Sequence, residues 1–473
     1  MSATGKAPIM TESIILLVFL ILLLCICKDR LKYKIYHPTI LVLVPFILSI
    51  LCGLLNYANW GYKLHWITVF VVGGGLLTFV VVSQLATFIV KKCCKKRGQY
   101  MQRRGTSLRL FDDGPAYRII CLAGIAFSMV TAVLLFLKVR EIVFNNGIEA
   151  TGITVLSEYD RLSKFSGVDV SSRGMIGQLA TAANALSYIW GYLFLKSIMS
   201  NHRKMAWGYG FNLLCSACIP LLTGARAGLI CLVISLTAMS LILFDQEKKV
   251  ISKKAKMTIC FFCVFGLIGL LICFKPIVQA MGRNTGDVDS FEYVSTYLGG
   301  SIMNLDMYLS DTEANPIEAR PEKWGEQTFA VLYESFAHWS GNDAVKKWNE
   351  WQPFQEANGH DLGNVYTVFY TFIFDWGIAG SFIAIGVVSF VSTVLYCSAT
   401  SDGASMGSFI SLPIVVYSFV SYGLVFCFFH NFIVTTTVSS GFIRYLIVWA
   451  FVVYAPCVVS LAIDKLRPSH VLR

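Results

Sequence analysis

The chain has 473 residues, of which 56% are hydrophobic and only 14% are charged. An average soluble domain carries about 25% charged residues, so this composition excludes a water-soluble globular protein. The formal net charge of +11 does not imply a nucleic-acid partner, because basic loops bind the anionic headgroups of membrane lipids.

Apolar runs of about twenty residues, the length of a helix that crosses a bilayer, recur along the sequence. Because a backbone within lipid must satisfy its own hydrogen bonds, such runs form helices. We therefore predict an all-α polytopic membrane protein with about eleven transmembrane helices. The expected spans are residues 9–27, 37–55, 66–90, 119–138, 175–199, 206–223, 227–244, 257–279, 376–397, 408–428 and 443–463.

The positive charges predict the orientation of these spans, since Lys and Arg gather on the cytoplasmic side of membrane proteins. Dense basic clusters occur within 91–97 and 248–254, and an eleven-span topology places both on one side. That side is predicted to be the cytoplasm. The N-terminus is then expected outside and the C-terminus inside.

Three regions follow from this topology. Residues 1–279 hold the first eight spans and their basic cytoplasmic loops, and residues 376–473 hold the last three spans and the tail. Residues 280–375 form a large loop on the outer face, in which we expect short helices, one of them over 291–309 along the membrane surface.

The outer loop has its own composition. Residues 280–361 contain 14 of the 28 Asp and Glu residues, and tryptophans recur among them. Aromatic faces beside carboxylates suit carbohydrate, so the loop is predicted to bind sugars, with Trp339 among the contacts. The alternative is that these aromatics simply form the core of a small folded cap.

Three outward-facing motifs carry polar chemistry. Arg226 lies in the short turn TGARAG, and Arg283 follows the eighth span; arginine can bind phosphate or pyrophosphate through two parallel hydrogen bonds. His360 and Asp361 precede the ninth span, and histidine transfers protons near neutral pH. Each motif has a plainer alternative, namely an arginine anchor at a helix end or a structural surface histidine.

Three segments are similar to a known family. GNVYTVFYTFIFDWGIAGSF at 363–382 resembles the end of the large periplasmic loop in Wzy-type O-antigen polymerases, which join oligosaccharide repeat units. TGARAGL at 223–229 resembles their arginine-bearing turn, and STYLGGSIMNLDMYL at 295–309 resembles a helical stretch early in their loop. The order and spacing of the three segments also agree with that family.

The resemblance implies an enzyme of the bacterial inner membrane with a glycosyltransferase C-type helical bundle. Such an enzyme moves a growing chain from undecaprenyl pyrophosphate onto a sugar hydroxyl of a new lipid-linked unit, on the periplasmic side. It uses no nucleotide sugar, cofactor or metal. A separate partner protein is expected to control chain length, and no nucleic acid is involved.

The resemblance also suggests roles for single residues. A sugar hydroxyl needs a base, for which His360 is the candidate, oriented by Asp361, with His338 as the rival. The pyrophosphate leaving group needs positive charge, which Arg226, Arg283 and Arg444 would supply. Sugar contacts are expected from Asn364, Tyr366, Trp339 and His338.

Other functions remain open at this stage. An O-antigen ligase shares the architecture and differs in its acceptor. A transporter or flippase for lipid-linked sugars would show repeated halves or polar helices at the bilayer midplane, and the sequence has neither a clear repeat nor many charges within spans. A non-catalytic assembly partner would use the acidic loop as a docking surface.

Overall fold

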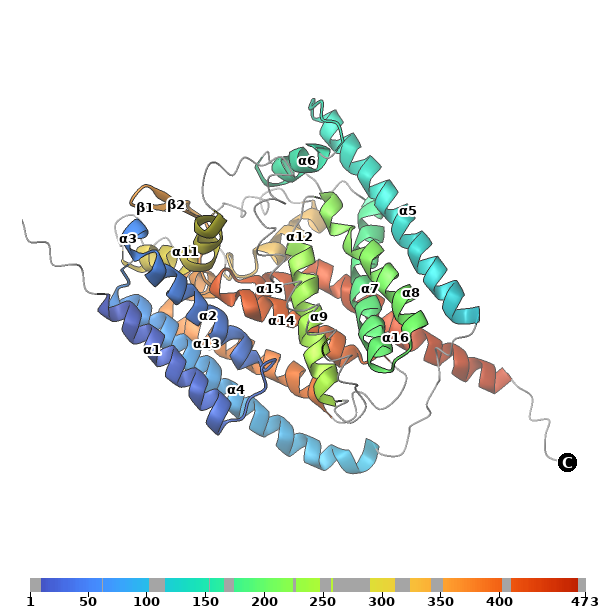
Figure 1. Cartoon of the computed structure of the whole chain (residues 1–473), viewed down its shortest axis with the longest axis horizontal. Coiled ribbons are helices and arrows are strands. Elements are labelled where there is room, and N and C mark those ends of the chain that lie inside the picture. Colours follow the sequence, from blue (N-terminus) through green and yellow to red (C-terminus); the bar gives the residue numbers. More distant parts are fainter. Residues whose placement is uncertain are drawn as a thin grey trace, which may run out of the picture. The chain divides into compact units, whose positions relative to one another are not determined.

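The computed structural model describes residues 10–61, 63–101, 115–152, 154–165, 174–223, 227–246, 257, 290–310, 324–341, 352–401 and 410–466. Within these ranges the chain is mostly helical, as the sequence predicts (Figure 1). Among the described residues, seven helices are long and apolar enough to cross a membrane, and two shorter apolar helices cover Leu412–Phe428 and Ser440–Tyr454. Apart from residue 257, the predicted span 257–279 lies outside the described residues, and the total of eleven spans stays a prediction.

The chain forms two compact units, and each is built from segments distant in sequence. Unit 1 consists of Met1–Arg97, Asp287–Cys397 and Val420–Ser440, and unit 2 consists of Gly98–Gly286, Ser398–Phe419 and Gly441–Arg473. The described parts of the predicted outer loop, residues 290–310, 324–341 and 352–375, therefore belong to the same compact unit as the first spans.

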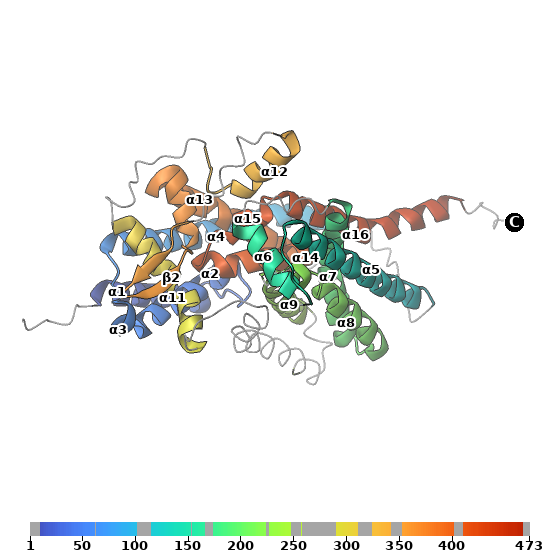
Figure 2. The same cartoon turned by 90° about the horizontal axis from the view of Figure 1, so that it is seen from above.

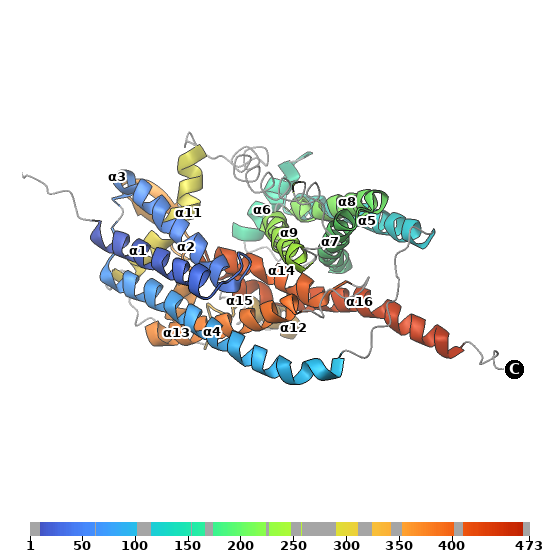
Figure 3. The same ribbon diagram turned by 60° about the horizontal axis from the view of Figure 1, so that its bottom comes forward.

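Unit 1 holds the elements that matter for the candidate site. They are α1 (Thr11–Cys25) with a π turn (Ile26–Arg30), α2 (Pro38–Leu55), α3 (Tyr57–Trp60), α4 (Trp66–Met101), α11 (Ser290–Ser310), α12 (Ala330–Ser340), β1 (Gln355–Ala357), β2 (His360–Gly363), α13 (Val368–Thr400), η5 (Phe426–Phe428) and α15 (Phe432–Thr437). Helices α1 and α2 lie side by side, and α11 packs on α2 (Figures 1 and 3).

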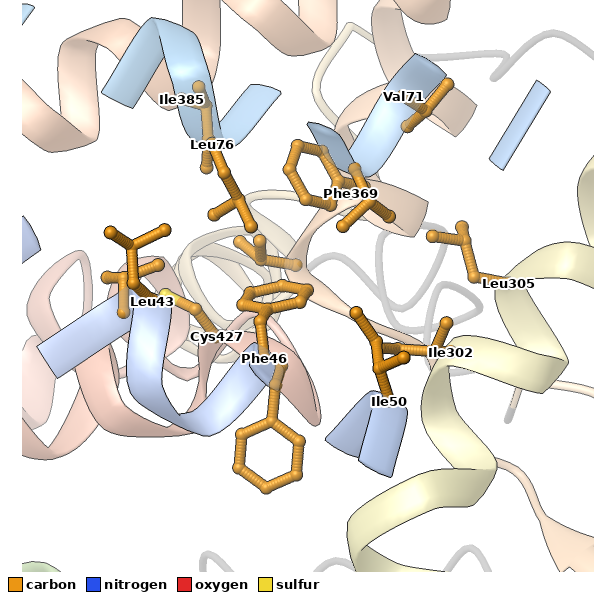
Figure 4. Packing of buried hydrophobic residues seen from close by; sticks show 14 of the residues in the cluster. Leu43, Phe46, Ile50, Val71, Leu76, Ile302, Leu305, Phe369, Ile385 and Cys427 are labelled. Carbon is orange, nitrogen blue, oxygen red and sulfur yellow. The ribbon is translucent and has the colours of Figure 1, made fainter. Parts of the chain in front are cut away.

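The core of unit 1 joins α11 to the apolar spans. Figure 4 shows buried side chains from α2, α4, α11 and α13 converging, among them Phe46, Ile302 and Phe369, each of which is fully buried. Two glycines allow this close packing: a Cβ on Gly75 of α4 would collide with the Phe369 ring, and one on Gly299 of α11 would lie 3.0 Å from the backbone of α2. The helix predicted over 291–309 is thus present as α11, and its middle is packed into the unit.

Helix α13 begins at Val368, before the predicted start at 376. The reason is a break at Gly377, whose φ of +69° and ψ of −177° are not helical. A left-handed φ of this kind favours glycine. The predicted span 376–397 corresponds to the part of α13 after the break.

Unit 2 contains α5 (Pro115–Asn145), α6 (Thr154–Phe165), α7 (Gly174–Met199), α8 (Arg203–Ala217), η3 (Pro220–Thr223), α9 (Ala227–Gln246), the beginning of α14 (Leu412–Val425) and nearly all of α16 (Ser440–Leu466). Helices α5, α7 and α8 pack together (Figure 3). The Trp449 indole N–H of α16 donates a 2.7 Å hydrogen bond to the Ala185 carbonyl of α7, which satisfies a buried polar group between two apolar helices.

Candidate functional site

A β-hairpin presents His360. Strands β1 and β2 pair antiparallel with Ala357 opposite His360, so Asn358 and Gly359 form a two-residue turn. Both turn residues have positive φ, +49° and +78°. Asn-Gly is the dipeptide that favours such hairpin turns, and His360 is therefore fixed as the first residue after the turn.

Helix α11 holds this hairpin in place (Figure 2). The Asn304 side-chain amide donates to the carbonyl oxygens of Leu362 at 3.3 Å, Gly363 at 3.2 Å and Val365 at 2.9 Å. Leu362 is fully buried, and a Cβ on Gly300 would lie 3.0 Å from its carbonyl oxygen. The backbone that carries His360 is consequently anchored along its far end.

The His360 ring forms a pair with a carboxylate of α11. Its Nδ1 lies 2.8 Å from Glu292 Oε1, and the two side chains are 35% and 33% exposed. Asp361, the expected orienting residue, is exposed, and its Oδ1 accepts a 2.7 Å hydrogen bond from the Gly363 N–H. With Nδ1 facing Glu292, the ring is left to act on a ligand through Nε2.

Tyr366 supports the hairpin from within. Its side chain is 1% exposed, its hydroxyl donates to the Pro353 carbonyl at 3.0 Å, and it accepts from the Gln355 amide at 3.0 Å. Burial raises the pKa of Tyr366 above its ordinary value. The hydroxyl is thus engaged with the strand before the turn, whereas Asn364 is only half-buried.

The remaining predicted residues are distributed differently. Trp339 lies in α12 of unit 1 and is 82% exposed. His338 belongs to the same helix, but its side chain lies outside the described residues, as do Arg226 and Arg283. Arg444 is an exposed residue of α16 in unit 2. The structure therefore brings together His360, Asp361, Asn364 and Tyr366 on one segment.

A buried carboxylate fixes the segment before α12. Asp375 of α13 accepts hydrogen bonds from the N–H groups of Gln327 at 3.1 Å and Thr328 at 2.7 Å. The Trp324, Phe329 and Trp376 rings pack against one another beside it. Phe329 and Trp376 are partly buried in this packing, whereas Trp324 is 69% and Trp339 is 82% exposed.

Sequence reasoning missed Glu292 and a second pair, His65 with Asp306. The His65 Nδ1 lies 2.8 Å from Asp306 Oδ2, and the His65 backbone N–H donates to Asp306 Oδ1 at 2.7 Å. No local spacing could reveal this pair, since its partners are 241 residues apart. The hairpin did have a sequence signal, the Asn358-Gly359 dipeptide.

Within the described ranges, no group of three or more His, Cys, Asp or Glu residues is placed to hold a metal ion. Comparisons of the chain with protein-family models, with curated proteins and with solved structures found no match.

Proposed function

We propose that this protein is a membrane glycosyltransferase that polymerises undecaprenyl-pyrophosphate-linked oligosaccharide repeat units into O-antigen or a related surface polysaccharide. It would act at the periplasmic face of the bacterial inner membrane. The pairing of His360 with Glu292, on a hairpin just before the apolar helix α13, carries this proposal. The similarity of residues 363–382 to the O-antigen polymerases supports it.

The proposed reaction assigns each bond change to a group. His360 Nε2 takes the proton of an acceptor sugar hydroxyl, and the oxygen attacks the anomeric carbon of the donor chain. The bond from that carbon to the pyrophosphate oxygen breaks, and undecaprenyl pyrophosphate leaves with the electron pair. Glu292 stabilises the imidazolium through Nδ1, because opposite charges at 2.8 Å attract strongly.

Other residues would support this step. Arg226, Arg283 and Arg444 are proposed to hold the leaving pyrophosphate, because guanidinium groups bind phosphates through paired hydrogen bonds. Asn364 and the exposed Trp339 are proposed sugar contacts. A glycosyltransferase C-type bundle and a separate chain-length regulator belong to the same proposal.

Reconstitution with one defined undecaprenyl-pyrophosphate-linked repeat unit tests the function, with chelator and without nucleotide sugar. A ladder of products spaced by one repeat is expected. His360→Gln should lower the rate by roughly 10² to 10⁴, and Glu292→Gln should lower it less. His202→Ala, at an exposed histidine of unit 2, is the matched control and should keep full activity.

The other outcomes are equally informative. A ladder that survives His360→Gln would remove the assigned base and leave the function intact. Absence of a ladder from folded protein would contradict the polymerase, and transfer to an added lipid-A core would then identify a ligase. Movement of the lipid-linked unit across the bilayer without bond formation would identify a transporter.

A further inference from the structure

His65, in the segment between α3 and α4, forms a second imidazole–carboxylate pair with Asp306 of α11. Asp306 is 2% exposed and uses both of its oxygens on one residue, His65, which is itself 51% exposed. A buried carboxylate that holds both the backbone and the ring of a histidine fixes the position and the tautomer of that ring. In a neutral imidazole, an Nδ1–H that donates to Asp306 leaves Nε2 as a hydrogen-bond acceptor.

An exposed aromatic ring adjoins this histidine. Trp66 begins α4 and is 57% exposed, and Lys63 is exposed as well, whereas Leu64 between them is buried. A fixed acceptor next to an aromatic face suits a ligand that has hydroxyl groups and an apolar C–H face. Sugar rings have both.

The separation between the His65–Asp306 pair and the His360–Glu292 pair suits an oligosaccharide. Asp306 and Glu292 are both on α11, fourteen residues apart in the sequence, which corresponds to about 21 Å along a helix. The rotation about the helix axis from one to the other differs by about 40° from a whole number of helical turns, so both carboxylates lie on a similar face of α11. One sugar linkage cannot contact both imidazoles, but an oligosaccharide can.

The two loops that carry the imidazoles contact each other. A Cβ on Gly61 would lie 2.8 Å from the Asn358 side-chain amide, so the hairpin turn packs against the chain end of α3. Asn358 is two residues from His360, and Gly61 is four residues from His65. The two imidazoles therefore belong to neighbouring loops of unit 1.

We infer that His65 and Trp66 form a second sugar subsite, which holds the far end of an oligosaccharide whose reacting end is at His360. The assignment of a reacting end at His360 rests on the proposed function, whereas the binding of sugar at His65 and Trp66 does not. Trp66 stacks on a sugar ring, and His65 Nε2 accepts from a sugar hydroxyl. Asp306 is a positioning residue, because it acts through His65.

Binding without reaction tests this subsite directly. The probe is the lipid-free repeat-unit oligosaccharide released by mild acid from the host's undecaprenyl-linked pool. Its binding to the purified full-length protein in nanodiscs can be measured by calorimetry. We expect Trp66→Ala and His65→Gln each to weaken binding about tenfold or more, and Trp66→Phe to weaken it less because a ring remains. His202→Ala, at an exposed histidine of unit 2, is the control and should bind as well as the wild type.

Kinetics separate this inference from the proposed function. In the polymerase assay, His65→Gln should raise KM with little change in kcat, whereas His360→Gln should lower kcat. Unchanged oligosaccharide affinity in both Trp66→Ala and His65→Gln would overturn the subsite and indicate that Trp66 is a membrane-interface anchor. Weakened binding in a protein that makes no ladder would keep the subsite and contradict the polymerase.

Discussion

The two imidazole–carboxylate pairs of unit 1 have the same distance between ring and carboxylate but different surroundings. In both, an Nδ1 atom lies 2.8 Å from a carboxylate oxygen of α11. Asp306 is 2% exposed, however, while Glu292 is 33% exposed. The Asp306 carboxylate also accepts from the His65 backbone N–H, whereas the His360 ring is the partner described for the Glu292 carboxylate.

This difference in burial indicates that the same imidazole–carboxylate interaction can serve stability in one place and activity in another. A buried carboxylate without partners is costly, so the loss of its partners affects folding. A half-exposed carboxylate regains water when its partner is removed, so its loss affects mainly the chemistry of the ring. We therefore expect Asp306 to matter for stability and Glu292 to matter for activity.

Replacing the two carboxylates gives the largest difference. Asp306→Ala should lower the free energy of unfolding by roughly 3 kcal/mol, because it leaves the N-terminus of α4 without its side-chain acceptor. Glu292→Ala should lower it by less than about 1 kcal/mol. Unfolding in mild detergent, followed by circular dichroism, measures both. Equal losses would show that burial does not distinguish the pairs.

The apolar spans of the molecule could be predicted from sequence because hydropathy is a local property. Helices α2, α7 and α9 begin and end within two residues of the predicted positions, whereas α4 and α5 continue past the predicted ends at 90 and 138 to Met101 and Asn145. The predicted start of α13 was too late, because Thr371 and Asp375 make its first turns more polar than a typical span. The break at Gly377 separates these first turns from the rest of the helix.

The pairs themselves could not be predicted, because they join segments that are distant in sequence. His360 was identified from its surroundings, but its partner Glu292 is 68 residues away. Asp361 was a reasonable expectation as a sequence neighbour, yet its carboxylate accepts from the Gly363 N–H two residues on. The hairpin could have been predicted, since Asn-Gly between short polar segments indicates such a turn.

High pH should affect the Asp306 end of α11 through Tyr308. Burial, the nearby Asp375 carboxylate and Tyr366 raise the pKa of Tyr308 from 10.0 to about 12. Below pH 10 the phenol is neutral in both states, so its contribution to stability is fully present. Between pH 10 and 12 the unfolded state ionises first, and up to roughly 2 kcal/mol of stability is lost.

Unfolding measured from pH 8 to pH 12 checks this expectation. The loss above pH 10 should be smaller in Tyr308→Phe, which cannot ionise, although Tyr366 will still contribute because its pKa is also raised. Identical pH curves for the wild type and Tyr308→Phe would contradict the assignment.

Asn304 lies between the two carboxylates on α11 and should affect only the His360 pair. Asn304→Ala removes the donor to three carbonyl groups at the end of β2, which should cost about 1–2 kcal/mol. Hydrogen exchange should accelerate in residues 355–365 and stay unchanged at the start of α4. The matched control is Asn59→Ala, since the Asn59 side chain is exposed; acceleration at both places would mean that α11 itself had shifted.

The turn residue Gly359 gives the smallest expected effect and isolates the hairpin most sharply. Its φ of +78° is unfavourable for alanine, so Gly359→Ala should cost about 1 kcal/mol, while Gly359→Asn should cost less because asparagine tolerates this conformation. Both variants leave Asp306 and His65 untouched. Polymerisation should therefore fall in Gly359→Ala in step with faster exchange at the hairpin, and the affinity of the lipid-free oligosaccharide should change less. A loss of affinity as large as that expected for Trp66→Ala would instead show that the turn holds the His65 loop, through the contact of Asn358 with Gly61, and that the two pairs form one site.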